Sequence, residues 1–114
     1  MKVIIAGSRI FQDYEVVKKA IEESGYPITE VVSGCALGVD SLGEHWGIKN
    51  NIPIVRFPAE WTKYKKASGP IRNQKMAEYG DALIAVWDNE SRGTGDMVRR
   101  MKKLDKEVHI KYVT

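Results

Sequence analysis

Ser91-Arg92-Gly93-Thr94-Gly95-Asp96 is the stretch whose residue types could most directly do chemistry. It follows the apolar run Ala82–Trp87 and opens a segment with helical spacing. A strand that ends in a glycine-rich turn and leads into a helix presents unpaired backbone N–H groups, backed by the positive end of the helix dipole, to an anion. The stretch therefore predicts a phosphate-binding turn. An ordinary turn with Thr94 as the helix cap is the alternative.

Two further loops combine glycine with groups that bind phosphate or ribose, and each follows a predicted strand. The first is Gly7-Ser8-Arg9, and the second runs from Ser33 to Asp40. Glycine lets a ligand approach the backbone closely, while hydroxyl and charged side chains bind its polar atoms. The candidate ligand-binding residues of the three loops are Gly7, Ser8, Arg9, Ser33, Gly34, Cys35, Ala36, Gly38, Asp40, Trp87, Ser91, Gly93, Thr94 and Gly95.

Several of these side chains have more than one interpretation. Arg9 either pairs with phosphate or stacks on a base, or it is a plain surface arginine. Asp40 either bonds ribose hydroxyls or caps the helix that it begins. Cys35 has no histidine near it in sequence, so we expect a small buried thiol rather than a nucleophile. His45 and His109 are isolated, and the sequence predicts no metal site.

A fourth segment adds an arginine beside an expected helix start. Arg72 and Asn73 follow Gly69-Pro70-Ile71, and a guanidinium at a helix N-terminus is unfavourable unless an anion is bound there. Trp61 precedes this segment together with Tyr64 and three lysines. These aromatic residues either stack on a base or form a lid, or they pack a loop onto the sheet edge. Trp61, Arg72 and Asn73 complete the candidate binding residues.

The elements that must position these loops are five strands alternating with helices. Apolar, β-branched runs predict strands at Val3 to Ala6, Glu30 to Ser33, Pro53 to Phe57, Ala82 to Trp87 and Val108 to Tyr112. Helical stripes are predicted after Asp13, at Leu42, Trp46 and the Ile48 side, from about Gly69 to Tyr79, and at Met97, Val98, Met101 and Leu104. We expect an α/β fold, a Rossmann-like three-layer sandwich whose five-stranded parallel sheet has order 3-2-1-4-5 and helices on both faces. Its ligand would bind beyond the carboxyl ends of strands 1, 2 and 4.

Composition agrees with a single domain over residues 1–114. The 43% hydrophobic and 29% charged residues are ordinary for a globular protein, and a net charge of +3 is a mild basic excess that does not require nucleic acid. One cysteine excludes an internal disulfide and suits a reducing compartment. No membrane span or signal peptide is recognisable, so we expect a cytoplasmic protein with no membrane partner.

The motifs taken together resemble the SLOG superfamily, named for the Smf/DprA and LOG proteins. They are Gly7-Ser8-Arg9, the Ser33-Gly34-x-Ala36-x-Gly38-x-Asp40 loop, Gly69-Pro70-x-Arg72-Asn73-x-x-Met76 and Gly93-Thr94. More closely, the chain resembles the small stand-alone domains of the YspA, cpYpsA-related type found in bacteria and phages. The resemblance extends from Met1 to about Val113. The resemblance implies a nucleotide-binding domain that needs no other cofactor, takes part in signalling and forms a homo-oligomer, either a dimer or a larger assembly.

LOG enzymes release a base from a nucleoside monophosphate, and the resemblance carries over part of their signature. Arg72, Met76, Asp81 and Gly93-Thr94 fit it, but Met97 stands where those enzymes carry a catalytic glutamate. A thioether cannot act as a general base or stabilise an oxocarbenium centre. We therefore expect non-catalytic binding of an ADP-ribose-like, NAD-like or cyclic nucleotide molecule. A LOG-like phosphoribohydrolase using Asp96 or Glu90 is the alternative, and single-stranded DNA binding as in DprA is the third hypothesis.

Overall fold

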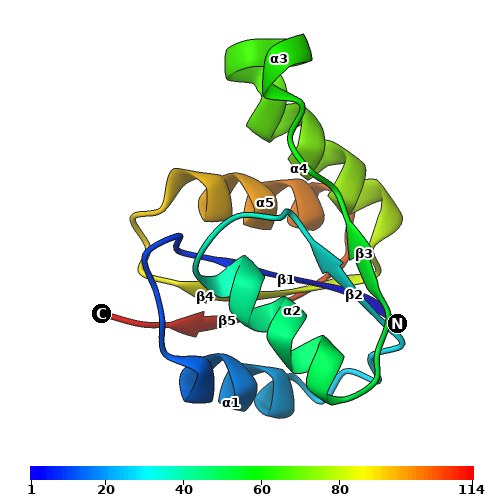
Figure 1. Cartoon of the computed structure of the whole chain (residues 1–114), viewed down its shortest axis with the longest axis vertical. Coiled ribbons are helices and arrows are strands. Elements are labelled where there is room, and N and C mark those ends of the chain that lie inside the picture. Colours follow the sequence, from blue (N-terminus) through cyan, green and yellow to red (C-terminus); the bar gives the residue numbers. More distant parts are fainter.

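Five parallel strands form one sheet at the centre of the protein. A computed structural model describes all residues 1–114. The elements are β1 (Lys2–Gly7), α1 (Tyr14–Ser24), β2 (Glu30–Ser33), α2 (Val39–Lys49), β3 (Ile54–Arg56), α3 (Trp61–Tyr64), the 3-10 turn η1 (Lys65–Ala67), α4 (Ser68–Tyr79), β4 (Ala82–Trp87), α5 (Arg92–Lys103) and β5 (Glu107–Tyr112). The sheet order is β3-β2-β1-β4-β5, all pairs are parallel, and the predicted topology is confirmed (Figure 1).

Two apolar cores cover the two faces of the sheet. Val17, Ala20 and Ile21 of α1 pack with Val39 of α2 against one face, and α4 and α5 cover the other. Alternate residues of β1 supply both cores, because successive side chains of a strand point to opposite faces. The α/β fold with helices on both faces is therefore confirmed, and none of the helices is long and apolar enough to cross a membrane.

Local signals set the ends of α1. The Asp13 side chain accepts a hydrogen bond from the backbone N–H of Glu15, 3.1 Å away, and so caps the helix. Gly25 ends it in the left-handed conformation, at φ 69°. Both ends lie where the sequence places them.

Helix α2 approaches the sheet closely at two glycines, and its Leu42 and Trp46 side chains are partly buried against the same core. A Cβ at Gly43 would lie 2.7 Å from Cγ2 of Ile5, and one at Gly47 would lie 3.1 Å from Cγ2 of Val31. The expected inward position of Ile48 is wrong, since this side chain is 61% exposed. The two glycines let the helix backbone approach the strands, which turns Ile48 toward solvent. Leu104 is also exposed, because α5 ends before it.

A projection built from α3, η1 and the first turn of α4 rises from the domain beside the sheet (Figure 1). No residue of α3 or η1 is buried. The sequence shows no helical stripe here, so neither short element was predicted. Helix α4 then begins at Ser68, one residue before its expected start.

Candidate functional site

A cavity of about 660 Å³ opens beyond the carboxyl ends of β1, β2 and β4. This is where the strand order reverses, since β1 lies between β2 and β4. The predicted binding residues that line it are Gly7, Arg9, Gly34, Cys35, Ala36, Asp40, Trp61, Arg72, Asn73, Ser91, Gly93 and Thr94. The fold therefore brings together side chains from all four sequence motifs.

Arg72 of α4 reaches across the cavity to the loop after β2. Its Nη1 donates to the carbonyl of Gly34, and its Nε donates to Oδ1 of Asn73 at 2.9 Å. A Cβ at position 34 would lie 2.8 Å from this Nη1 and 2.9 Å from Oδ2 of Asp40. A side chain at position 34 would therefore displace the Arg72 guanidinium or the Asp40 carboxylate. Nη2 of Arg72 donates to no protein acceptor and is free to bind an anion.

Asp40 is a buried carboxylate near the N-terminus of α2, with 6% of its surface exposed. Burial raises its pKa from 3.8 to about 6, although the N–H of Ala36 and the charge of Arg72 both favour the ionised form. Its Oδ2 accepts from the Ala36 N–H at 3.2 Å, and the N-cap residue of α2 is Gly38, with no side-chain cap. Asp40 therefore holds the loop that precedes the helix and does not cap the helix itself.

Asn73 joins Arg72 to helix α5. Its Nδ2 donates to the carbonyl of Gly93 at 3.3 Å and to Oδ2 of Asp96 at 2.9 Å. The same Oδ2 accepts from Nε of Arg100 at 2.8 Å. Burial raises the pKa of Asp96, but the hydrogen bonds from Arg100 and Asn73 outweigh it, so the pKa lies below its usual value. Asp96 is thus an ionised carboxylate at the cavity wall, with Oδ1 unpaired.

The turn between β4 and α5 is held by Asp88, which sequence reasoning missed. Its Oδ1 accepts from the N–H groups of Glu90 at 2.9 Å and Ser91 at 2.8 Å, and these bonds lower its pKa. Helix α5 begins at Arg92, so Gly93 lies inside its first turn rather than before it. No side chain caps this turn, and its N–H groups remain available at the cavity.

Five predicted binding residues lie outside the cavity and support its loops. The Ser33 hydroxyl donates to Oε2 of Glu44 at 2.6 Å, and the Ser8 hydroxyl accepts from the N–H of Ile10 at 3.4 Å. Trp87 donates through Nε1 to the carbonyl of Ser91 at 3.1 Å, and Gly95 packs on its ring. Gly38 adopts φ 72° next to the Ser8 and Arg9 carbonyls.

The expectation of a buried Cys35 thiol is wrong, because the side chain is exposed. Cys35 adopts φ 64° in the turn after β2, which directs its side chain to the cavity instead of the core. Partial desolvation of the thiol, together with the negative charge of Glu44, raises the thiol pKa, which lowers the thiolate fraction at neutral pH. Of the two catalytic candidates, Asp96 lines the cavity and Glu90 does not. No group of three His, Cys, Asp or Glu side chains is placed to hold a metal ion.

Several lining residues were not predicted as binding residues. They are Ala6, Pro58, Ala59, Gly69, Pro70, Met76, Arg92, Met97 and Arg99. Arg92 and Arg99 are seven residues apart on α5, a spacing that puts both on one helix face. This spacing is the sequence signal from which the two arginines could have been predicted.

Comparisons with known proteins agree with the fold. Residues 1–64, more than half of the chain, match the YspA, cpYpsA-related SLOG family. The chain belongs to this family. The SLOG domain is also similar in structure to DNA processing protein A (DprA) from Streptococcus pneumoniae, with a TM-score of 0.76 and 19% sequence identity. The similarity covers 94% of this chain and 48% of DprA, so the SLOG domain spans about half of that protein. No curated protein sequence matches it significantly.

The cavity is lined by residues inside and outside the segment that matches the family. Gly7, Gly34 and Asp40 lie inside the matched segment, whereas Arg72 and Gly93 lie beyond it. The hydrogen bond from Arg72 to the Gly34 carbonyl crosses that boundary. The site therefore depends on residues that the matched segment does not contain.

Proposed function

We propose that this SLOG domain binds a nucleotide or a nucleotide-derived signal, such as an ADP-ribose-like, NAD-like or cyclic nucleotide molecule, and does not cleave it. Such a protein senses or sequesters its ligand. The observation that carries the proposal is that Arg72, held in place by Gly34 and Asn73, shares one cavity with the uncapped first turn of α5. A fixed guanidinium and free helix N–H groups are both phosphate ligands.

The charge and size of the cavity support an anionic organic ligand. Its charged lining residues are two aspartates, Asp40 and Asp96, and four arginines, Arg9, Arg72, Arg92 and Arg99. Positive charge is therefore in excess, which attracts phosphate and raises the association rate. A volume of about 660 Å³ lies in the range of small-molecule sites. The carboxylate of Asp40 lines the cavity and is suited to accept hydrogen bonds from ribose hydroxyls.

Met97 supports binding without chemistry. Its side chain is 2% exposed, packs in the core shared by α4 and α5, and offers no proton acceptor to the cavity. Hydrolysis of an N-glycosidic bond is the second candidate, favoured by one observation. Asp96 is ionised at the cavity wall and its Oδ1 is unpaired, although its Oδ2 is already engaged by Asn73 and Arg100.

Isothermal titration calorimetry with AMP, NAD, ADP-ribose and cyclic AMP tests the binding proposal. Binding of at least one is expected, and Arg72→Ala should weaken it at least tenfold, as expected for loss of a charge-assisted hydrogen bond. Lys102→Ala removes one positive charge from the exposed part of α5 and serves as the control. Absence of binding, or equal losses in the two variants, would contradict the proposal.

A second pair of measurements separates binding from hydrolysis. Free base released from AMP or NAD is followed by chromatography with wild type and Asp96→Asn. We expect no release by either protein. Turnover that disappears in Asp96→Asn would establish the hydrolase instead.

A further inference from the structure

The cavity has two chemically different ends. The end at the sheet edge carries the polar groups of Gly34, Arg72, Asn73 and the first turn of α5. The other end is formed by the segment after β3 and by the first turn of α4, and its lining residues are Pro58, Ala59, Trp61, Gly69 and Pro70. None of these five carries a charge. A ligand with one anionic end and one aromatic end matches this division.

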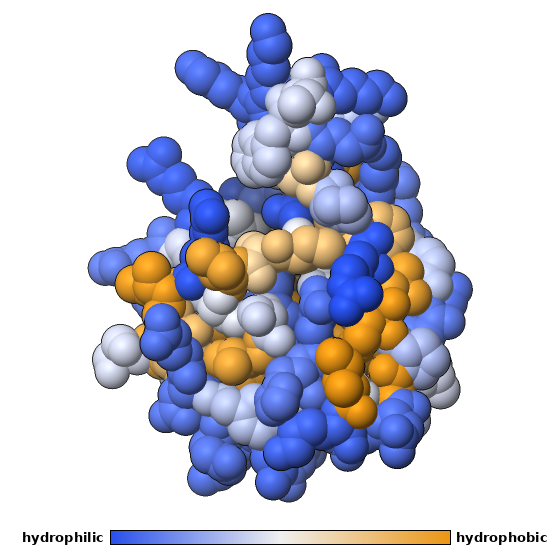
Figure 2. Space-filling view, in the orientation of Figure 1, coloured by the Kyte–Doolittle hydropathy of each residue, from blue (hydrophilic) through white to orange (hydrophobic).

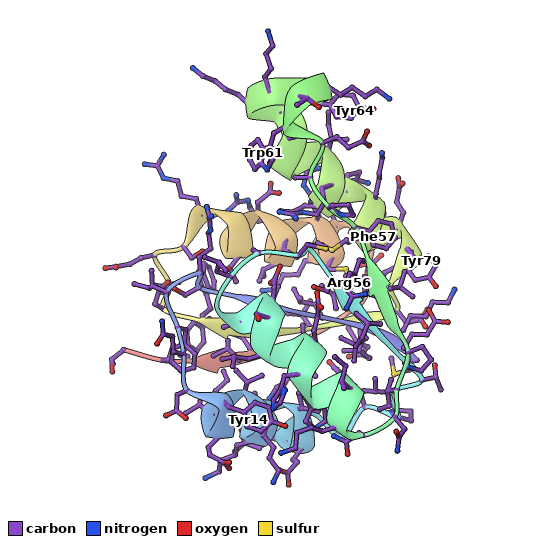
Figure 3. All side chains as sticks on the ribbon, viewed as in Figure 1. Tyr14, Arg56, Phe57, Trp61, Tyr64 and Tyr79 are labelled. Carbon is purple, nitrogen blue, oxygen red and sulfur yellow. The ribbon has the colours of Figure 1, made fainter.

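Trp61 is the largest group at the uncharged end. Its side chain is 60% exposed, and its indole N–H donates to no protein acceptor. It lies over Gly69, where an added Cβ would come 4.0 Å from its ring, and Figure 3 shows it on the side of the projection that faces α5. An indole that is left largely in water at the mouth of a cavity offers a flat apolar face to a second ring.

The base of the projection fixes where Trp61 lies. The Glu60 carbonyl accepts from the N–H groups of Lys63 and Tyr64 and from the Ser68 hydroxyl, each at 3.0 Å. Ser68 is 1% exposed, and Nζ of Lys75 lies 3.6 Å from the Glu60 carboxylate. Trp61 follows Glu60 directly, so its backbone is held by these bonds. Such an arrangement lowers the entropy cost of stacking.

The lysines near Trp61 do not share the cavity with it. Nζ of Lys63 and Nζ of Lys75 lie 5.0 and 5.8 Å from the ring centroid of Tyr64. No lysine lines the cavity, and Figure 2 shows a largely hydrophilic surface over the tip of the projection. The stacking face is therefore separate from the basic tip, unlike a groove in which cations and aromatics alternate along a nucleic-acid strand.

We propose that Trp61 forms the base subsite of the cavity, stacking on the purine or pyrimidine ring of a ligand whose phosphate lies at Arg72 and the first turn of α5. This inference deepens the proposed function and rests on it. It fixes the orientation of the ligand, with the phosphate at the sheet edge and the base at the mouth. A stacking surface at the mouth accepts any of the common bases, so it distinguishes ligands that have a base from those that lack one.

The test compares ligands that have or lack a base. Calorimetric titrations use AMP, GMP, CMP and UMP, with ribose 5-phosphate as the probe without a base. Trp61→Ala should weaken the binding of the four nucleotides about 5- to 150-fold, which is the range that base–aromatic stacking supplies. It should leave the affinity for ribose 5-phosphate unchanged. Trp61→Phe should retain most of the wild-type affinity for nucleotides, whereas Arg72→Ala should weaken the binding of every probe.

A second readout follows the indole itself. Nucleotide binding should quench tryptophan fluorescence in wild type more than in Trp61→Phe, which retains Trp46 and Trp87. Nucleotide binding that Trp61→Ala leaves unchanged would overturn the base subsite while the proposed function stands. An equal loss for ribose 5-phosphate would assign Trp61 a structural role and also overturn it. Absence of binding by these five probes and by NAD, ADP-ribose and cyclic AMP would contradict the proposed function itself.

Discussion

Replacing Asp40 by asparagine should stabilise the protein at neutral pH. The carboxylate is buried, and its pKa rises from 3.8 to about 6 on folding. Between these two values the unfolded chain releases its proton while the folded protein keeps it. The folded state therefore loses stability as pH rises from about 4 to about 6, and the loss is complete above pH 6.

The size of this loss follows from the shift. A difference of about two pKa units corresponds to about 3 kcal/mol in the free energy of unfolding. Asparagine has nearly the same shape and can keep the hydrogen bond from the Ala36 N–H, but it carries no charge to desolvate. Asp40→Asn should thus be more stable than wild type by up to about 3 kcal/mol at pH 7, with little difference at pH 4.

Urea unfolding of both proteins at pH 4, 5, 6 and 7 measures this difference. With a slope of about 1.5 kcal/mol/M, the midpoint at pH 7 should rise by about 1–2 M in the variant. Glu22→Gln, at an exposed position of α1, controls for removal of one negative charge. A variant less stable than wild type at pH 7, or a difference independent of pH, would refute the reasoning. A destabilising charge at the cavity is expected of a ligand-binding group, because function is often kept at the expense of stability.

Three further substitutions test the packing and the polar network. Asn73→Ala should lower the free energy of unfolding by about 2 kcal/mol and weaken AMP binding, because it releases Arg72; unchanged unfolding and binding would contradict its bridging role. Gly47→Val should lower the free energy of unfolding, measured by thermal unfolding, by about 1–3 kcal/mol, because a Cβ there would lie 2.5 Å from Cδ1 of Ile54. An unchanged stability would mean that α2 can move away from the sheet freely. Lys106→Met should lower the free energy of unfolding in urea by about 1–2 kcal/mol, because the Lys106 Nζ donates to three carbonyls at the end of α4. An unchanged stability would show that water replaces the ammonium group at these carbonyls.

The sequence predicted the sheet well because its signals there are local and redundant. The β2 and β4 ranges match the prediction residue for residue, and Asp13 and Gly25 mark the ends of α1 through chemistry within one turn. Parallel strands buried on both faces read as continuous apolar runs. The order of strands then follows from the handedness of the crossovers.

The site was predicted as a set of loops but not in its details. Ser33 and Trp87 have the residue types of ligand contacts, yet their polar atoms are used by Glu44 and the Ser91 carbonyl. These partners come from the three-dimensional packing of side chains, which spacing alone does not give. Cys35 was misplaced because its left-handed backbone conformation carries no residue signature in a non-glycine position.

The helices on the two faces of the sheet come from different halves of the chain, so truncation of the chain would uncover one face. A fragment ending at residue 64, where the family match ends, would contain β1, β2, β3, the short α3 and only the two helices of one face, α1 and α2. Ile4 and Val32, which are fully buried, would lose their cover from α4 and α5, and β1 would lose its hydrogen-bonding partner β4. Such a fragment should not fold by itself. We therefore expect the smallest unit that folds by itself to extend through β5, well past the segment by which the family is recognised.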